Sequence, residues 1–311
     1  MPTSCAPLRV DVTAKGLRLD RAALARALAV LPAGAPVVAM VHGYRFAPDA
    51  KGNCPHGHIF SVTPPQNDWT AISWPQQLGL GNGQGLAIGF GWHGRGAFLT
   101  ASLRARATGR ALAEMAGLVQ EIDPGRPFDA IAHSLGARVV LAALHHAKAG
   151  DLRRLILLAG AEARRPAERA MATTAGHAVQ VINVTTREND LFDLLFEWFA
   201  VAGLDTAIGQ GLRHTPANWL DVQIDQAATL AALAHLGYPL RTPAGRISHW
   251  SPYARDGVFR LYRALIDGSL SVADLRAALP ARRDARWSRL LGLRALSQHL
   301  PHVQPRPAPK P

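Results

Sequence analysis

The sequence predicts an α/β protein with a mostly parallel central sheet flanked by helices. Short apolar runs bounded by glycine and proline alternate with longer segments of helical periodicity. Such runs are typical of strands buried on both faces, with crossover helices joining parallel neighbours. The 311-residue chain is 48% hydrophobic and 18% charged, so it can bury a sizeable core, and we expect one main domain over residues 1–280.

The expected strands follow one another along the chain, with helices between them. They cover residues 37–41, 86–92, 128–132, 155–158 and 179–185, with 220–224 as a further candidate. Helical patterns lie near residues 99–121 and 135–148. Ligands of open parallel sheets bind at the carboxyl ends of the strands, so the residues directly after these runs are the candidates for chemistry.

A candidate nucleophile lies where the third of these strands gives way to a helix. The segment reads FDAIAHSLGARVV, with Ser134 at the change. A tight strand-to-helix turn exposes the serine oxygen and needs small residues on both sides, which Ala132 and Gly136 supply. The backbone N–H of Leu135 is placed to bind a developing oxyanion. Serine is also a preferred N-cap residue, so an ordinary helix start is the alternative.

Together with this turn, further signals resemble the α/β-hydrolase superfamily over residues 36–268. A His-Gly motif, His42-Gly43, follows an early strand, and an acid and then a histidine follow Ser134 in the order that this family uses. The resemblance implies a serine hydrolase with a Ser-His-Asp triad and without a cofactor or a metal. It also implies that a loop N–H after the early strand completes the oxyanion hole. Tyr44 matches that position, and Arg45 is the alternative.

The family order also assigns the acid and the base. The segment VQVINVTTRENDLF carries Asp190 before an apolar helix start, which makes it the expected acid. Glu188 is the alternative, and either carboxylate could instead cap the helix. The expected base is His249, in the turn-like segment RISHWSP before a helical pattern. The other histidines after the acid lie in the basic tail, before a proline or in a helical run, and fit less well: His214, His235, His299 and His302.

Residues at other strand ends are expected to line the substrate pocket: His42, Gly43, Arg45, Trp92 and His133. The excursion at 191–246 begins with the apolar sequence LFDLLFEWFAVAG, and we expect it to cover the site and line an acyl pocket. A buried core helix is the alternative. The expected activity is carboxylic ester hydrolysis of the esterase or lipase-like kind. A thioesterase or amidase would use the same triad, and a non-catalytic binding or scaffold protein is the alternative from another class.

Two other motifs compete with this interpretation. Cys54, His56 and His58 offer zinc ligands close together, and an extended segment would place both imidazoles on one side. No fourth ligand with suitable spacing is evident, so a loop near the mouth of the site is preferred. The sequence GFGWHG at 89–94 matches a dinucleotide-binding pattern, yet the next strand ends in His133 and Ser134, not in an acid that would hold a ribose.

Half of the formal net charge of +12 lies near the C-terminus. Residues 281–311 contain seven Lys+Arg and one Asp, and they end in a Pro-rich tail. Before that tail, ARWSRLLGLRAL has the pattern of a basic amphipathic helix. Such a helix would dock on the body of the protein or make weak contact with a membrane surface or an acidic partner. This distribution argues against nucleic acid as a partner.

The sequence gives no indication of export or of a membrane span. It contains no run of about 18 apolar residues, and the N-terminal segment lacks a signal-peptide pattern. Cys5 and Cys54 lie in unrelated contexts and suggest no disulfide framework. We therefore expect a soluble, cytoplasmic protein that acts on a small acyl substrate.

Overall fold

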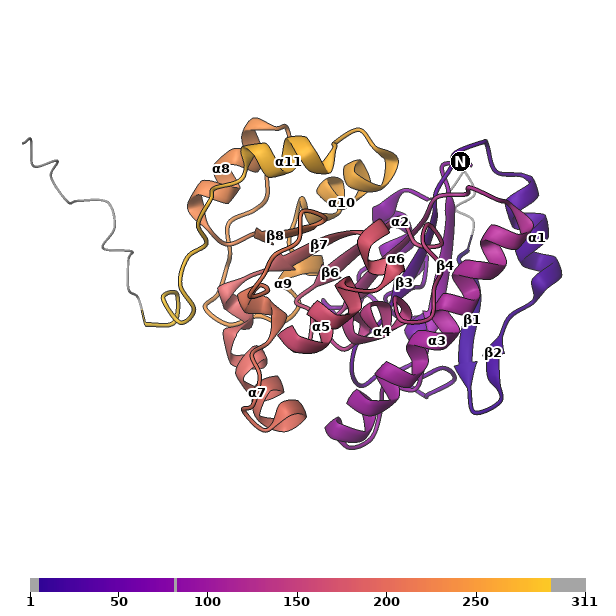
Figure 1. Cartoon of the computed structure of the whole chain (residues 1–311), viewed down its shortest axis with the longest axis horizontal. Coiled ribbons are helices and arrows are strands. Elements are labelled where there is room, and N and C mark those ends of the chain that lie inside the picture. Colours follow the sequence, from indigo (N-terminus) through magenta and orange to yellow (C-terminus); the bar gives the residue numbers. More distant parts are fainter. Residues whose placement is uncertain (1–5, 81–82, 292–311) are drawn as a thin grey trace, which may run out of the picture.

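One sheet organises the chain. The structure is a computed structural model and describes residues 6–80 and 83–291. Its strands are β1 (Leu8–Thr13), β2 (Gly16–Arg18), β3 (Val37–Val41), β4 (Leu86–Gly91), β5 (Phe128–His133), β6 (Arg154–Leu158), β7 (Gln180–Thr185) and β8 (Trp219–Gln223). They form one sheet in the order β2-β1-β4-β3-β5-β6-β7-β8 (Figure 1), in which only β1 and β2 pair antiparallel. The predicted α/β class with a mostly parallel sheet is confirmed.

Helices cover both faces of the sheet because alternate strand residues point to opposite sides. In β3, Val37, Ala39 and Val41 enter one core, and Val38 and Met40 enter the other. The first core is closed by α1 (Arg21–Ala29), α3 (Phe98–Ile122), α4 (Gly136–Ala143), α5 (Arg164–Met171) and α6 (Thr174–Ala178). The second is closed by α2 (Trp74–Leu78), α8 (Ala227–His235), α9 (Ser251–Ala254), α10 (Val258–Asp267) and α11 (Val272–Ala278).

The segment 191–246 differs from the expected cap. It contains most of α7 (Asp190–Val201), then the short helix η3 (Ile208–Gln210), β8 and α8. The strand β8 extends the sheet beside β7, and Leu220 and Val222 enter the second core. Of this segment, α7 is the part that lines the cavity described below. One helix of the segment expected as a cap thus lies at the cavity, and the rest of the segment belongs to the sheet and its helical layer.

The C-terminal segment is described as far as residue 291. Residues 286–291 form turns instead of the expected helix, and Trp287 and Arg286 contact α7. Residues 292–311, with the remainder of that expected helix and the Pro-rich tail, lie outside the described residues. No helix in the described part of the chain is both long and apolar enough to cross a membrane.

Candidate active site

Ser134 occupies a strained turn between β5 and α4. Its φ of 55° lies in the left-handed region that few non-glycine residues adopt. A Cβ on Gly136 would lie 2.7 Å from the carbonyl oxygen of Val41, and a Cβ on Gly43 would lie 2.7 Å from Cβ of Ser134. Both neighbours must therefore be glycine for the loop after β3 to approach the turn, which holds the serine in its unusual conformation.

Two backbone N–H groups beside Ser134 are free to bind an anion. The N–H of Arg45 donates to the carbonyl oxygen of Gly94 over 2.8 Å, which removes Arg45 as an alternative donor. The N–H groups of Tyr44 and Leu135 have no partner among the residues that the structure describes. Leu135 also precedes the first turn of α4, where the helix dipole favours negative charge.

His249 is held by Asn189. Nδ1 of the imidazole lies 2.6 Å from Oδ1 of Asn189, and Nδ2 of Asn189 donates over 2.9 Å to Oδ1 of Asp193. Since the amide nitrogen faces a carboxylate, the amide oxygen faces the histidine and accepts from its Nδ1–H. This leaves Nε2 of His249 as the proton acceptor. The ring also stacks on Phe192, with centroids 4.7 Å apart.

The expectation that Asp190 orients His249 is wrong for this structure. Oδ2 of Asp190 accepts the N–H of Trp287 over 2.7 Å, and Asn189 takes the position beside the imidazole. The residues 187–189 form a 3₁₀ turn, in which successive side chains point about 120° apart. Asn189, one position before Asp190, therefore faces the imidazole, so an amide stands where a carboxylate was expected.

Glu188, the other expected acid, supports from a different side the segment that carries His249, residues 246–252, which we call the histidine loop. Its carboxylate is buried and pairs with Arg255, and it accepts from Oγ of Ser251 over 2.7 Å. Its backbone oxygen accepts the N–H of Ser248 over 2.9 Å. Glu188 thus fixes the chain on both sides of His249 without contacting the imidazole.

Burial makes the imidazole of His249 a neutral group. Its pKa lies well below the ordinary value because the ring is desolvated, and neighbouring His133 lowers it further. The pKa of His133 is lowered to about 4 by the same burial. Nε2 of His133 donates to the carbonyl oxygen of His249 over 3.0 Å, so His133 positions the backbone of the histidine loop.

His42 and Trp92 do not line the cavity, contrary to expectation. Both side chains are fully buried, and their rings stack with centroids 5.3 Å apart. The backbone N–H of Trp92 donates to Nε2 of His42, and the indole N–H donates to its carbonyl oxygen. Burial lowers the pKa of His42 to about 3. The pair fixes the loop that presents Gly43 to Ser134, and Gly43 likewise packs against the turn instead of lining the cavity.

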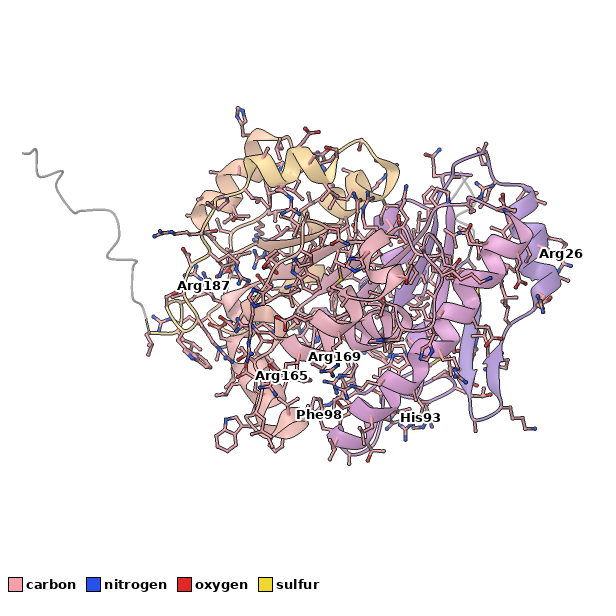
Figure 2. All side chains as sticks on the ribbon, in the orientation of Figure 1. Arg26, His93, Phe98, Arg165, Arg169 and Arg187 are labelled. Carbon is pink, nitrogen blue, oxygen red and sulfur yellow. The ribbon has the colours of Figure 1, made fainter. Side chains whose placement is uncertain are left out.

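A cavity of about 590 Å³ opens above Ser134 and His249. In the described part of the chain, no hydrogen bond joins Oγ of Ser134 to the imidazole, although both side chains line this space. One wall is apolar and consists of Phe98, Phe192, Leu195, Phe196 and Phe199. Other lining residues are polar, and we call them the polar wall: Arg45, Asn53, His58 and Asp68. Figure 2 shows Phe98 at the N-terminal end of α3, on the side where α7 lies.

The loop with Cys54, His56 and His58 is not extended. Residues 55–57 form a 3₁₀ turn, so the imidazoles reach different partners. Nε2 of His56 bonds Asp11 over 2.7 Å, and Nε2 of His58 bonds Asp68 over 2.9 Å. Within the described residues, no group of three or more His, Cys, Asp or Glu side chains is arranged to hold a metal ion. Of the three loop residues, only His58 reaches the cavity, which it lines beside Asp68.

The comparisons with known proteins add little to this geometry. No protein-family model and no curated protein matches the chain. One solved structure that it resembles is described as RedJ with a polyethylene glycol molecule bound in the active site. The identity is 13%, the match covers 50% of this chain and 69% of that chain, and the TM-score is 0.26. At this level of similarity no functional property transfers to the present chain.

Proposed function

We propose that the chain is a serine hydrolase of the α/β-hydrolase type that cleaves carboxylic esters. The observation that carries the proposal is the meeting of two groups in one cavity. Ser134 stands on a strained strand-to-helix turn, and His249 stands across the same space with its Nδ1–H held by Asn189. A nucleophile, a base and a group that orients the base are the parts that acyl transfer needs.

The reaction proceeds through an acyl-enzyme. Nε2 of His249 accepts the hydroxyl proton of Ser134 as Oγ attacks the ester carbonyl carbon. The N–H groups of Tyr44 and Leu135 bind the resulting oxyanion, each lowering the barrier by about 2.7 to 4 kcal/mol. The imidazolium then gives its proton to the departing alkoxide. Water attacks the acyl group with His249 as base again, and Ser134 is released with its proton.

Asn189 replaces the usual carboxylate of such a triad. Its amide oxygen fixes the tautomer of His249 and the direction of Nε2, which is the orienting role of the third residue. A neutral amide stabilises the imidazolium less than a carboxylate would. The serine and the histidine therefore perform the proton transfer, and Asn189 with Asp193 holds the ring in place.

The cavity favours an ester with an apolar acyl chain. Its phenylalanine-rich wall lies on α7 and at the start of α3, where it would desolvate a hydrocarbon chain. The polar wall, with His58 and Asp68, would accommodate the alcohol portion. An acyl group bound along the apolar wall places its carbonyl near Ser134.

Hydrolysis of p-nitrophenyl esters with increasing acyl length tests this function. We expect turnover that rises with chain length until the cavity is filled, and we expect Ser134→Ala and His249→Ala to abolish it. Ser269→Ala is a matched control, because Ser269 is exposed and bonds only nearby groups. A folded native protein that hydrolyses none of these esters would instead favour a non-catalytic binding protein.

A further inference from the structure

The helix α7 buries its charged residues and exposes apolar ones. Its charged residues, Asp190, Asp193 and Glu197, are all buried. Its most exposed residues are apolar: Leu195 at 43%, Trp198 at 69% and Phe199 at 65%. A surface helix normally presents charged residues to water and apolar residues to the core. The outward face of α7 is therefore suited to contact with an apolar surface instead of water.

The buried carboxyl groups of α7 have hydrogen-bond partners inside the protein. The carboxylate of Glu197 accepts from Arg286 and from the N–H of Ala207, each over 2.9 Å. Asp193 accepts from the amide of Asn189, as described above. Because these contacts hold the polar side of α7 inward, the apolar side is fixed outward.

The start of α3 extends this apolar face. Leu99 and Leu103 are 52% and 58% exposed, and Phe98 packs edge-on against Phe196 of α7 with centroids 6.4 Å apart. In Figure 1, α7 and the N-terminal end of α3 project together beyond the rest of the molecule. We call the exposed set the apolar rim: Leu99, Leu103, Leu195, Trp198 and Phe199. Leu195 and Phe199 also line the cavity, so the rim is continuous with the candidate active site.

Arginines stand one to two helical turns behind the rim. Arg106 and Arg110 are exposed and follow Leu103 on the same stripe of α3, about 4.5 and 10 Å farther along its axis. Arg106 and Arg169 line a second cavity of about 270 Å³ together with His145 and His146. The carboxylate in that cavity, Glu162, is buried and lies 2.6 Å from Arg138 and 3.8 Å from Arg106, so Arg106, which is 43% exposed, is only partly neutralised. Figure 2 shows Arg165 and Arg169 on α5, on the side of the molecule where Phe98 lies.

We propose that the apolar rim docks on an anionic lipid surface and that the acyl substrate enters the cavity from it. Leucine and tryptophan side chains enter the boundary between headgroups and acyl chains, typically about 5–10 Å deep. The arginines then lie at the level of the negative headgroups, where each cation strengthens binding. The exposed arginines beside the rim complement a negatively charged surface, which favours anionic lipid as the occupant. Delivery of substrate depends on the proposed function, but docking does not.

Binding to vesicles tests docking without any chemistry. The full chain carrying Ser134→Ala is sedimented with vesicles of phosphatidylglycerol and phosphatidylcholine, and with vesicles of phosphatidylcholine alone. We expect binding to the anionic vesicles that weakens at high salt. Leu103→Ser combined with Trp198→Ser should weaken it about tenfold or more, because two large apolar side chains no longer enter the lipid. Arg106→Gln with Arg169→Gln should weaken binding to anionic vesicles specifically.

Matched controls lie on the far side of the molecule. Val30 is 79% exposed after α1, and Arg26 lies at the opposite edge in Figure 2, so Val30→Ser and Arg26→Gln should bind as the parent does. Leu103 and Trp198 do not line the cavity, so their variants should keep activity on a soluble ester. Undiminished vesicle binding by the double variant Leu103→Ser, Trp198→Ser would overturn the proposal. So would self-association in solution, without vesicle binding, that this variant abolishes. If neither the native chain nor its variants hydrolyse esters but the native chain binds anionic vesicles, the proposed function is refuted and docking is not.

Discussion

Nδ1 of His249 donates a hydrogen bond to Oδ1 of Asn189 over 2.6 Å, and Asp193 holds the other end of that amide. The imidazole therefore has an oriented Nδ1–H but no negative charge in direct contact with it. A carboxylate there would raise its pKa, whereas burial beside a neutral amide lowers it. This arrangement keeps the ring neutral and ready to accept a proton.

Removing the amide should impair chemistry more than binding. In Asn189→Ala, the ring of His249 loses the partner that fixes its tautomer, so we expect kcat to fall by roughly 10²-fold with a smaller change in KM. Steady-state kinetics on a p-nitrophenyl ester measure both. Asn53→Ala is a control on the polar wall that leaves the histidine untouched. Equal effects of the two variants on kcat would argue against an orienting role for Asn189.

Exchanging the side chains of Asn189 and Asp193 should shift the pH dependence of kcat/KM. Because the pKa of His249 lies below about 6.5, its neutral form persists under mildly acidic conditions, and kcat/KM should fall only at lower pH. In the double variant Asn189→Asp, Asp193→Asn, a carboxylate contacts the imidazole and raises that pKa. The acid limb of kcat/KM should then shift to higher pH. An unchanged limb would mean that a different group titrates in that limb.

Two helical glycines should respond oppositely to alanine. Gly136→Ala places a Cβ 2.7 Å from the oxygen of Val41 and should destabilise the protein by about 1–3 kcal/mol. Gly117, on α3, has no atom within 4 Å of its added Cβ, so Gly117→Ala should stabilise by about 1 kcal/mol. Urea unfolding gives both free energies of unfolding. A tolerated Gly136→Ala would contradict the close approach of the β3 loop to the Ser134 turn.

The buried ion pair behind the histidine loop should matter far more than an exposed one. Glu188→Ala leaves Arg255 buried and unpaired, which should lower the free energy of unfolding by about 3–5 kcal/mol. The pair of Arg241 and Asp256 has side chains 72% and 77% exposed, so Asp256→Ala should cost about 0–1 kcal/mol. Thermal unfolding compares the two variants. Similar losses in both would mean that Glu188 does not anchor the loop.

The main strands and the Ser134 turn could be predicted because their signals are local. Continuous apolar runs predict strands buried on both faces, and small residues around a serine between a strand and a helix predict the turn. The edge strand β2 and its neighbour β1 were not predicted. In β1, whose sequence is LRVDVT, apolar and polar residues alternate instead of forming a continuous apolar run.

The partner of His249 could not be predicted, because three consecutive polar residues compete on one short turn. Glu188, Asn189 and Asp190 point in three directions, and the phase of the 3₁₀ turn decides which of them meets the imidazole. That phase depends on distant partners, Arg255 for Glu188 and Trp287 for Asp190. A similar reason explains why the prediction that His42 and Trp92 line the cavity is wrong. The end of a strand places a residue at the carboxyl edge of the sheet. It does not determine whether the side chain faces the cavity or the core.

Reaction with a fluorophosphonate probe shows whether Ser134 is an activated nucleophile, because only an activated serine is phosphonylated. The intact chain is treated, digested and mapped by mass spectrometry, with Ser134→Ala and His249→Ala in parallel and circular dichroism to confirm folding. We expect one modified residue, Ser134, and no labelling in either variant. Labelling at another serine, or none in the folded native chain, would contradict it.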